Sequence, residues 1–119
     1  MAERNLDVQH VTNEINYYGT QTTVRVVTNT EYSKWGDATE TTSDETKTAF
    51  VQILRQEDEI VKEGIFKSGD KIFWFKGNET NINRGNRIQH SGKWYEIIET
   101  IEHEVAGTVF IIEARTKKI

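Results

Sequence analysis

The stretch Gly69-Asp70-Lys71-Ile72-Phe73-Trp74-Phe75 decides the fold, because its opening recurs sixteen residues later as Gly85-Asn86-Arg87-Ile88. In each copy a glycine and a small polar residue, which set a turn easily, precede an alternation of charged and apolar residues. The β-branched and aromatic residues that follow fit a pleated, half-buried surface. The two copies therefore predict two turns of similar geometry, each leading into a short antiparallel strand.

Further strands are predicted where β-branched and apolar residues alternate with polar ones between Gly, Asn, Asp and Ser turns. The predicted strands cover residues 21–28, 48–55, 70–76, 93–100 and 108–115, and the second motif copy introduces one more before Ser91-Gly92. Ser91-Gly92 is predicted to be a tight hairpin turn. Because closure removes exposed sheet edges, we expect a mainly β fold, a small antiparallel β-barrel of about six strands spanning residues 20–115.

Two segments fall outside this strand pattern. In residues 5–18, apolar side chains recur at spacings of three and four, which predicts a short N-terminal helix. Residues 29–47 are rich in threonine and acidic groups and are predicted to form one long polar loop. Structureless connections of that length are usually functional or disordered. The loop is therefore a candidate channel or interface element, with candidate residues Tyr32, Trp35, Asp37, Glu40, Asp44 and Glu45.

Composition indicates one domain, residues 1–119, whose core is thin. Only 35% of the residues are hydrophobic, 29% are charged, and the absence of cysteine excludes a disulfide framework. Residues 1–60 carry five basic and eleven acidic groups, a net −6, whereas residues 61–119 carry ten and eight, a net +2. This split fits an ordinary solvated surface, or a two-faced subunit whose acidic side meets the basic side of a neighbour.

The sequence predicts neither an enzyme nor a cofactor or metal site. Its histidines, His10, His90 and His103, lie in different predicted elements, and no serine sits in a Gly-x-Ser-x-Gly elbow. Gly69 and Gly85 introduce strands rather than helices, so they do not form a phosphate-binding loop. The longest apolar runs are four residues, and the N-terminus lacks the apolar stretch of a signal peptide. We therefore expect no membrane partner and a cytoplasmic site of synthesis.

Aromatic residues on the predicted strands are the stronger candidates for binding. Trp74 and Trp94, with Arg84 and Arg87 nearby, are candidates for an interface on the barrel surface. Barrels that bind single-stranded nucleic acid stack bases on such aromatics. The acidic total, with a pI near 5.4, favours core packing and a protein interface instead. A third alternative is a barrel that binds peptides along an exposed strand edge.

The order of these parts resembles the head–tail connector proteins of long-tailed viruses, of the head-closure (stopper) or neck-adaptor type. The resemblance covers about residues 20–115. It rests on a β-rich opening followed by Tyr32-Ser33-Lys34-Trp35-Gly36-Asp37, Ala49-Phe50-Val51-Gln52, the Gly64 to Gly69-Asp70 entry, Ile82 to Ile88, and Gly92-Lys93-Trp94-Tyr95-Glu96-Ile97.

The resemblance implies a structural virion protein located at the virion neck and assembled in the host cytoplasm. Such a subunit forms a cyclic ring with copies of itself beneath the portal, closes the DNA channel, and offers a docking surface to the tail. Its partners would be the portal or adaptor ring and the tail proteins. The 29–47 segment would then reach toward the channel, where its acidity would repel the packaged DNA rather than bind it.

Overall fold

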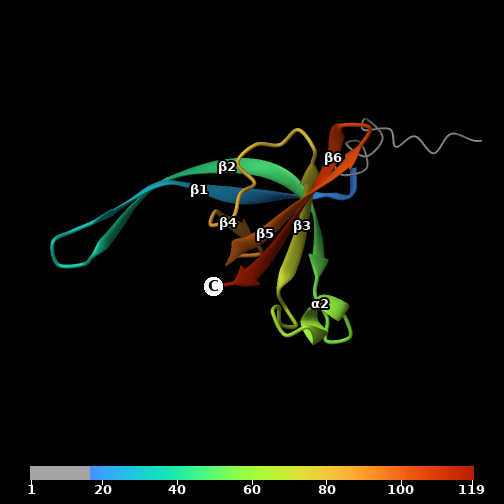
Figure 1. The fold of residues 1–119 in the computed structure, drawn as a ribbon, viewed down its shortest axis with the longest axis horizontal. Helices are drawn as coiled ribbons and strands as arrows, with labels where there is room; N and C mark the ends of the chain where they lie inside the picture. Colours follow the sequence, from blue (N-terminus) through green and yellow to red (C-terminus); the bar gives the residue numbers. More distant parts are fainter. Residues whose placement is uncertain (1–16) are drawn as a thin grey trace, which may run out of the picture.

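The computed structural model, described here for residues 17–119, is a closed six-stranded antiparallel β-barrel (Figure 1). The mainly β barrel expected from the sequence is confirmed. Of the predicted N-terminal helix over residues 5–18, all but Tyr17 and Tyr18 lies outside the described residues. The elements are β1 (Thr20–Tyr32), β2 (Ala38–Ile53), the one-turn helix α2 (Glu59–Lys62), β3 (Lys71–Lys76), β4 (Arg87–His90), β5 (Lys93–Val105) and β6 (Thr108–Lys118).

Antiparallel pairing runs around the barrel in the order β1-β2-β3-β6-β5-β4, and β4 closes it by pairing with β1. Hairpins join β1 to β2, β4 to β5 and β5 to β6. The predicted Ser91-Gly92 turn is confirmed, since it links the paired strands β4 and β5. Strand β5 runs to Val105, five residues further than predicted, and turns into β6 at Ala106-Gly107.

Strand alternation places a continuous apolar core inside the barrel. Phe73 lies at its centre, stacked on Phe75 at 6.5 Å and edge-on to Tyr95 at 5.8 Å between ring centroids. The other fully buried interior side chains are Val24, Ala49, Ile88, Ile97 and Ala114. A second apolar cluster lies on the outer face of β3, where Leu54, Phe66 and Ile72 pack near α2.

The repeated glycine motif forms two turns of matching geometry, as predicted. Gly69 and Gly85 both have positive φ, 97° and 94°, a conformation that favours glycine. The Gly69 N–H donates to Leu54 O, and the Leu54 N–H donates to Asp70 O. In the second copy the Gly85 N–H donates to Ile97 O, and the Ile97 N–H donates to Asn86 O. Each copy thus binds one buried apolar residue of another segment through two backbone hydrogen bonds.

The polar residue after each glycine is buried and binds a distant strand. Asp70 Oδ1 accepts from the Lys118 N–H at 3.0 Å, and Oδ2 accepts from the Lys67 N–H at 2.8 Å. Asn86 Oδ1 accepts from the Val27 N–H at 3.1 Å, while its Nδ2 donates to Asn81 O. The motif is therefore a structural device that ties its turn to the end of β6 in one case and to β1 in the other.

The prediction of a long loop over residues 29–47 is wrong. Its residues belong to β1 and β2, which pair from Thr20↔Ala49 to Tyr32↔Ala38, and only residues 33–37 form a turn. The threonines and acids that suggested a loop alternate along two strands, and β-branched threonine favours strand geometry. Because this part of the hairpin leaves the barrel, neither face needs apolar residues, and the strand signal disappears from the sequence pattern.

The outer part of the β1–β2 hairpin, residues 30–42, projects away from the barrel (Figure 1). Every side chain in this range is exposed. We call this segment the arm, and residues 32–37 its tip.

Candidate functional site: the arm and the barrel surface

The tip of the arm presents two aromatic side chains to solvent on an ordered turn. Tyr32 is 73% exposed and Trp35 is 79% exposed. The Ser33 N–H donates to Asp37 O at 2.7 Å, and Ser33 Oγ accepts from the backbone N–H groups of Trp35 and Asp37. Gly36, with φ of 87°, completes the turn. The tip is therefore held in one backbone conformation without help from the barrel.

Two bidentate ion pairs hold the base of the arm. Arg25 donates from Nε and Nη2 to the two oxygens of Asp44 at 2.8 and 3.0 Å. Arg87 of β4 donates from both Nη atoms to Glu40 at 3.0 and 3.1 Å. The hydrogen bond from Arg25 lowers the pKa of Asp44, and the same bond raises the pKa of Arg25. Exposed ion pairs add little to the free energy of unfolding, but the two parallel hydrogen bonds of a bidentate pair fix the relative orientation of the two side chains.

The same network reaches a tryptophan on the barrel surface. The guanidinium carbon of Arg25 lies 4.2 Å from the centroid of the Trp94 ring, a cation–π contact. Arg25, Arg87 and Trp94 line a shallow hollow with Glu96 and Ile119. The structure therefore brings together Glu40 and Asp44 from the predicted loop and Arg87 and Trp94 from the predicted barrel surface.

The other sequence-predicted residues do not join this cluster. Glu45 accepts a hydrogen bond from Asn81 at 2.9 Å and an ion pair from Lys47, so it ties β2 to the connection before β4. The Trp74 indole donates to Gln52 at 3.3 Å, and its ring stacks on His103 at 5.9 Å between centroids. Arg84 is exposed on the turn that contains Gly85. Glu45, Trp74 and Arg84 therefore lie on separate parts of the barrel surface.

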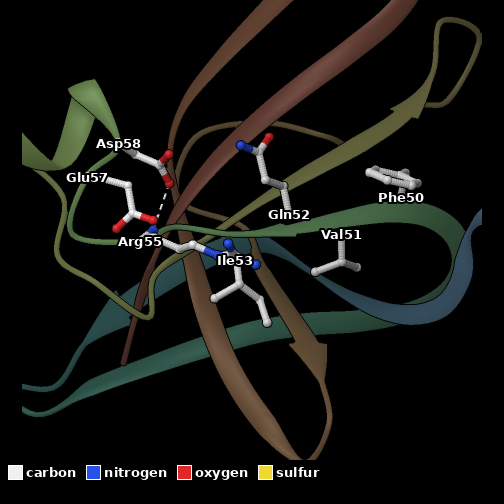
Figure 2. Close-up of a pocket in the computed structure, with 7 residues that line it drawn as sticks. All are labelled: Phe50, Val51, Gln52, Ile53, Arg55, Glu57 and Asp58. Carbon is white, nitrogen blue, oxygen red and sulfur yellow. Dashed lines mark hydrogen bonds between the residues drawn. The ribbon is translucent and has the colours of Figure 1, made fainter.

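Sequence reasoning missed a groove of about 520 Å³ beside the end of β2. Figure 2 shows its lining residues: Phe50, Val51, Gln52 and Ile53 from the strand, and Arg55, Glu57 and Asp58 from the turn that follows. Phe50 is 46% exposed and Ile53 is 57% exposed, although their segment is apolar enough to suggest a central strand. β1 begins only at Thr20, opposite Ala49, so the backbone edge of β2 beyond Ala49 is not paired with β1.

A buried lysine lies at the start of β3. Lys71 is 7% exposed, its Nζ lies 2.8 Å from His90 Nδ1, and it sits 4.8 Å from the centroid of the Tyr95 ring. Burial, followed by the charge of Lys71, lowers the pKa of His90. Nδ1 of the neutral imidazole then accepts a hydrogen bond from the Lys71 ammonium. The cluster aligns no nucleophile.

Residues 17–119 contain no group of three or more His, Cys, Asp or Glu side chains placed to hold a metal ion. No helix in that part of the chain has the length and apolar character needed to cross a membrane.

Comparisons with known proteins bear on the fold alone. No protein-family model matches the chain, and no curated protein matches it. Among solved structures, the chain is similar to the solution structure of protein SF1141 from Shigella flexneri 2a, a target of the Northeast structural genomics consortium. The TM-score is 0.60 at 21% sequence identity, and the match covers 82% of this chain and 89% of that chain. At this identity the likeness supports the barrel and its connectivity.

Proposed function

We propose that this protein is a structural subunit of the head–tail connector of a long-tailed virus. In this proposal copies of the chain form a ring at the virion neck, beneath the portal, and the ring closes the DNA channel and receives the tail. The single observation that carries the proposal is the arm, a preorganised hairpin that leaves a closed barrel and exposes Tyr32 and Trp35 at its tip. The proposed role requires no catalytic group.

The composition of the tip favours protein partners. Tryptophan and tyrosine are enriched at the centres of protein interfaces, where they contribute most of the binding free energy. A hairpin whose turn is already hydrogen-bonded loses less conformational entropy on binding than a flexible loop would. Portal, adaptor and tail proteins, or further copies of this chain, are the partners expected for such an arm.

Charge on the arm favours a position near DNA without binding to it. The arm, residues 30–42, carries three acidic groups, Glu31, Asp37 and Glu40, and one basic group, Lys34. A segment of this charge repels a phosphate backbone, whereas nucleic-acid binding proteins present basic surfaces. The arm therefore suits a channel that must hold packaged DNA back.

Contacts on the barrel surface disfavour the alternative of single-stranded nucleic acid binding. A base stacking on Trp94 would compete with the guanidinium of Arg25, and a phosphate approaching Arg87 would compete with Glu40. Trp74 already stacks on His103. Both tryptophans thus have intramolecular partners, which supports the connector proposal over base stacking.

Electron microscopy of purified virus particles tests the proposal. We expect a ring of density at the neck. The ring should be missing from particles that lack this chain, and a tag on the chain should label the ring. A matched variant replaces residues 30–40 with Asn-Gly, which joins the paired residues Asn29 and Thr41 through a two-residue hairpin turn. We expect this variant to fold but to fail in channel closure or tail joining.

Two results would refute the connector proposal. One is the absence of the chain from particles. The other is tight binding of the purified protein to an oligonucleotide with a steep dependence on salt, which is the signature of phosphate contacts.

A further inference from the structure

Two separate features of this chain expose large apolar side chains. The first is the tip of the arm, with Tyr32 and Trp35. The second is the groove beside the end of β2, with Phe50 and Ile53. Described residues cover neither one. Large apolar side chains that gather at two separate places mark interaction sites more often than chance exposure.

The groove lies along an open strand edge, to which the edge of another hairpin could pair. Residues Phe50–Ile53 pair with β3, but β1 ends its pairing with β2 at Ala49. Since the Leu54 N–H donates to Asp70 O, alternation along β2 directs the backbone groups of Val51 and Ile53 toward the open edge. Unpaired strand edges in a sheet accept further strands from other chains.

Each feature carries both basic and acidic side chains, so individual charges of the tip can pair with opposite charges of the groove. The tip carries Lys34, whose Nζ lies 5.1 Å from the Trp35 ring centroid, and the groove carries Glu57 and Asp58. Asp58 uses one carboxylate oxygen to accept a hydrogen bond from the Arg55 N–H, as Figure 2 shows. The tip also carries Asp37, which is complementary to Arg55. An indole in the apolar part of the groove would therefore bring Lys34 toward the acidic rim.

The tip of a chain cannot reach the groove of the same chain. The arm extends from one end of β2, whereas the groove lies at the opposite end, near α2 (Figure 1). Strand β2 has 16 residues, so the two features are roughly 50 Å apart along it at about 3.3 Å per residue. A contact between them must form between copies of the chain.

We propose that the arm tip of one copy docks in the β2 groove of a second copy, with Trp35 against Val51 and Ile53 and Lys34 against Glu57 and Asp58. The contact joins different surfaces of the two copies, so it is a heterologous, head-to-tail contact. Such contacts generate a closed ring when the rotation between copies closes. This inference rests on the proposed function and names the contact that builds the ring.

Disulfide trapping tests the contact, because the chain contains no native cysteine. One chain carries Tyr32→Cys, which leaves Trp35 and Lys34 in place, and the other carries Ile53→Cys. The control partner carries Ile65→Cys, a position that is also 57% exposed but does not line the groove. In a glutathione redox buffer we expect the heterodimer with Ile53→Cys to form about tenfold faster than the control, equivalent to about 1.4 kcal/mol.

Second-site changes separate docking from random collision. Trp35→Ala in the Tyr32→Cys chain should reduce the trapping rate to that of the control. Lys34→Glu should also reduce it, and Glu57→Lys in the partner chain should restore it. Equal rates with Ile53→Cys and Ile65→Cys, or a rate that does not respond to Trp35→Ala, would overturn the inference.

The outcomes distinguish this contact from the connector proposal. If microscopy places the chain in a neck ring while trapping equals the control, the ring uses another surface and only the inference fails. If trapping succeeds with the predicted dependence on Trp35 and Lys34 but particles lack the chain, the self-contact stands and the connector proposal fails.

Discussion

Asp70→Asn and Asn86→Asp exchange the polar residues of the two glycine motifs. The two turns share a backbone geometry, but their polar side chains make different hydrogen bonds, so we expect neither residue to replace the other. Asp70 accepts two backbone N–H groups, from Lys67 and Lys118, whereas Asn86 accepts from Val27 and donates to Asn81 O. Asp70→Asn turns an NH₂ group toward one of two N–H donors. Asn86→Asp turns a carboxylate oxygen toward a carbonyl oxygen that lies 2.8 Å from Asn86 Nδ2. Each substitution should therefore lower the free energy of unfolding.

The magnitudes follow from burial, since Asp70 and Asn86 are only 6% and 5% exposed. Loss of a hydrogen bond to a charged acceptor should cost Asp70→Asn about 1.5–3 kcal/mol, and an unpaired buried group should cost Asn86→Asp about 1–3 kcal/mol. The second loss should shrink toward about pH 4, where a protonated carboxyl can again donate to Asn81 O.

Urea denaturation followed by tryptophan fluorescence, at about pH 7 and about pH 4, measures both effects. Asp37→Asn is the matched control, because Asp37 is exposed on the arm tip and should change stability by less than about 0.5 kcal/mol. If both exchanges stay within that limit, the buried side chains do not hold the turns and the glycine backbone alone explains the motif. An equal loss for Asn86→Asp at both pH values would refute the assignment of its Nδ2 as a donor.

Three further predictions concern the barrel. Gly77→Ala should prevent stable folding or cost several kcal/mol in a denaturant titration, because its Cβ would overlap the backbone carbonyl of Val109, 2.6 Å from the carbonyl carbon. Phe73→Ala should lower the free energy of unfolding by about 3–5 kcal/mol, since the ring is fully buried between Phe75 and Tyr95; a smaller loss in urea titration would show that the core collapses around the gap. The pKa of His90 is lower in the folded protein than its ordinary 6.5, so on acidification the unfolded state binds a proton at a higher pH than the folded state does. Stability should therefore fall as the pH drops below about 6.5, and the fall should end once the pH reaches the pKa of the folded state. His90→Gln should flatten that part of a plot of urea midpoint against pH, and an unchanged slope would show that other groups cause it.

The sequence predicted the barrel well because the relevant signals are local. Positive φ at Gly69 and Gly85 requires a residue without Cβ, and the alternation after each glycine must match the inside and outside of a strand. Both constraints can be read from adjacent residues. The turns, the strand they admit at Lys71, and the hairpin at Ser91-Gly92 were predicted for that reason.

The arm and the groove were not predicted because neither depends on local signals. A hairpin exposed on both faces has no apolar alternation, so Thr30 and Thr41 read as loop residues although they sit in paired strands. The groove lies where the pairing of β1 with β2 has ended, since β1 begins opposite Ala49. That offset depends on the register between β1 and β2, which cannot be read from one sequence.

Strand pairing also bears on the charge difference between the two halves of the chain. The acidic first half was one reason to expect a two-faced subunit. Within the barrel, however, Glu40 of the first half pairs with Arg87 of the second, Lys47 lies 3.9 Å from Glu79, and Arg25 neutralises Asp44. The Glu40–Arg87 pair joins an acid of the first half to a base of the second, whereas the other two pairs do not reduce the charge difference between the halves. In the proposed contact, recognition between copies should depend on the charges at the arm tip and around the β2 groove.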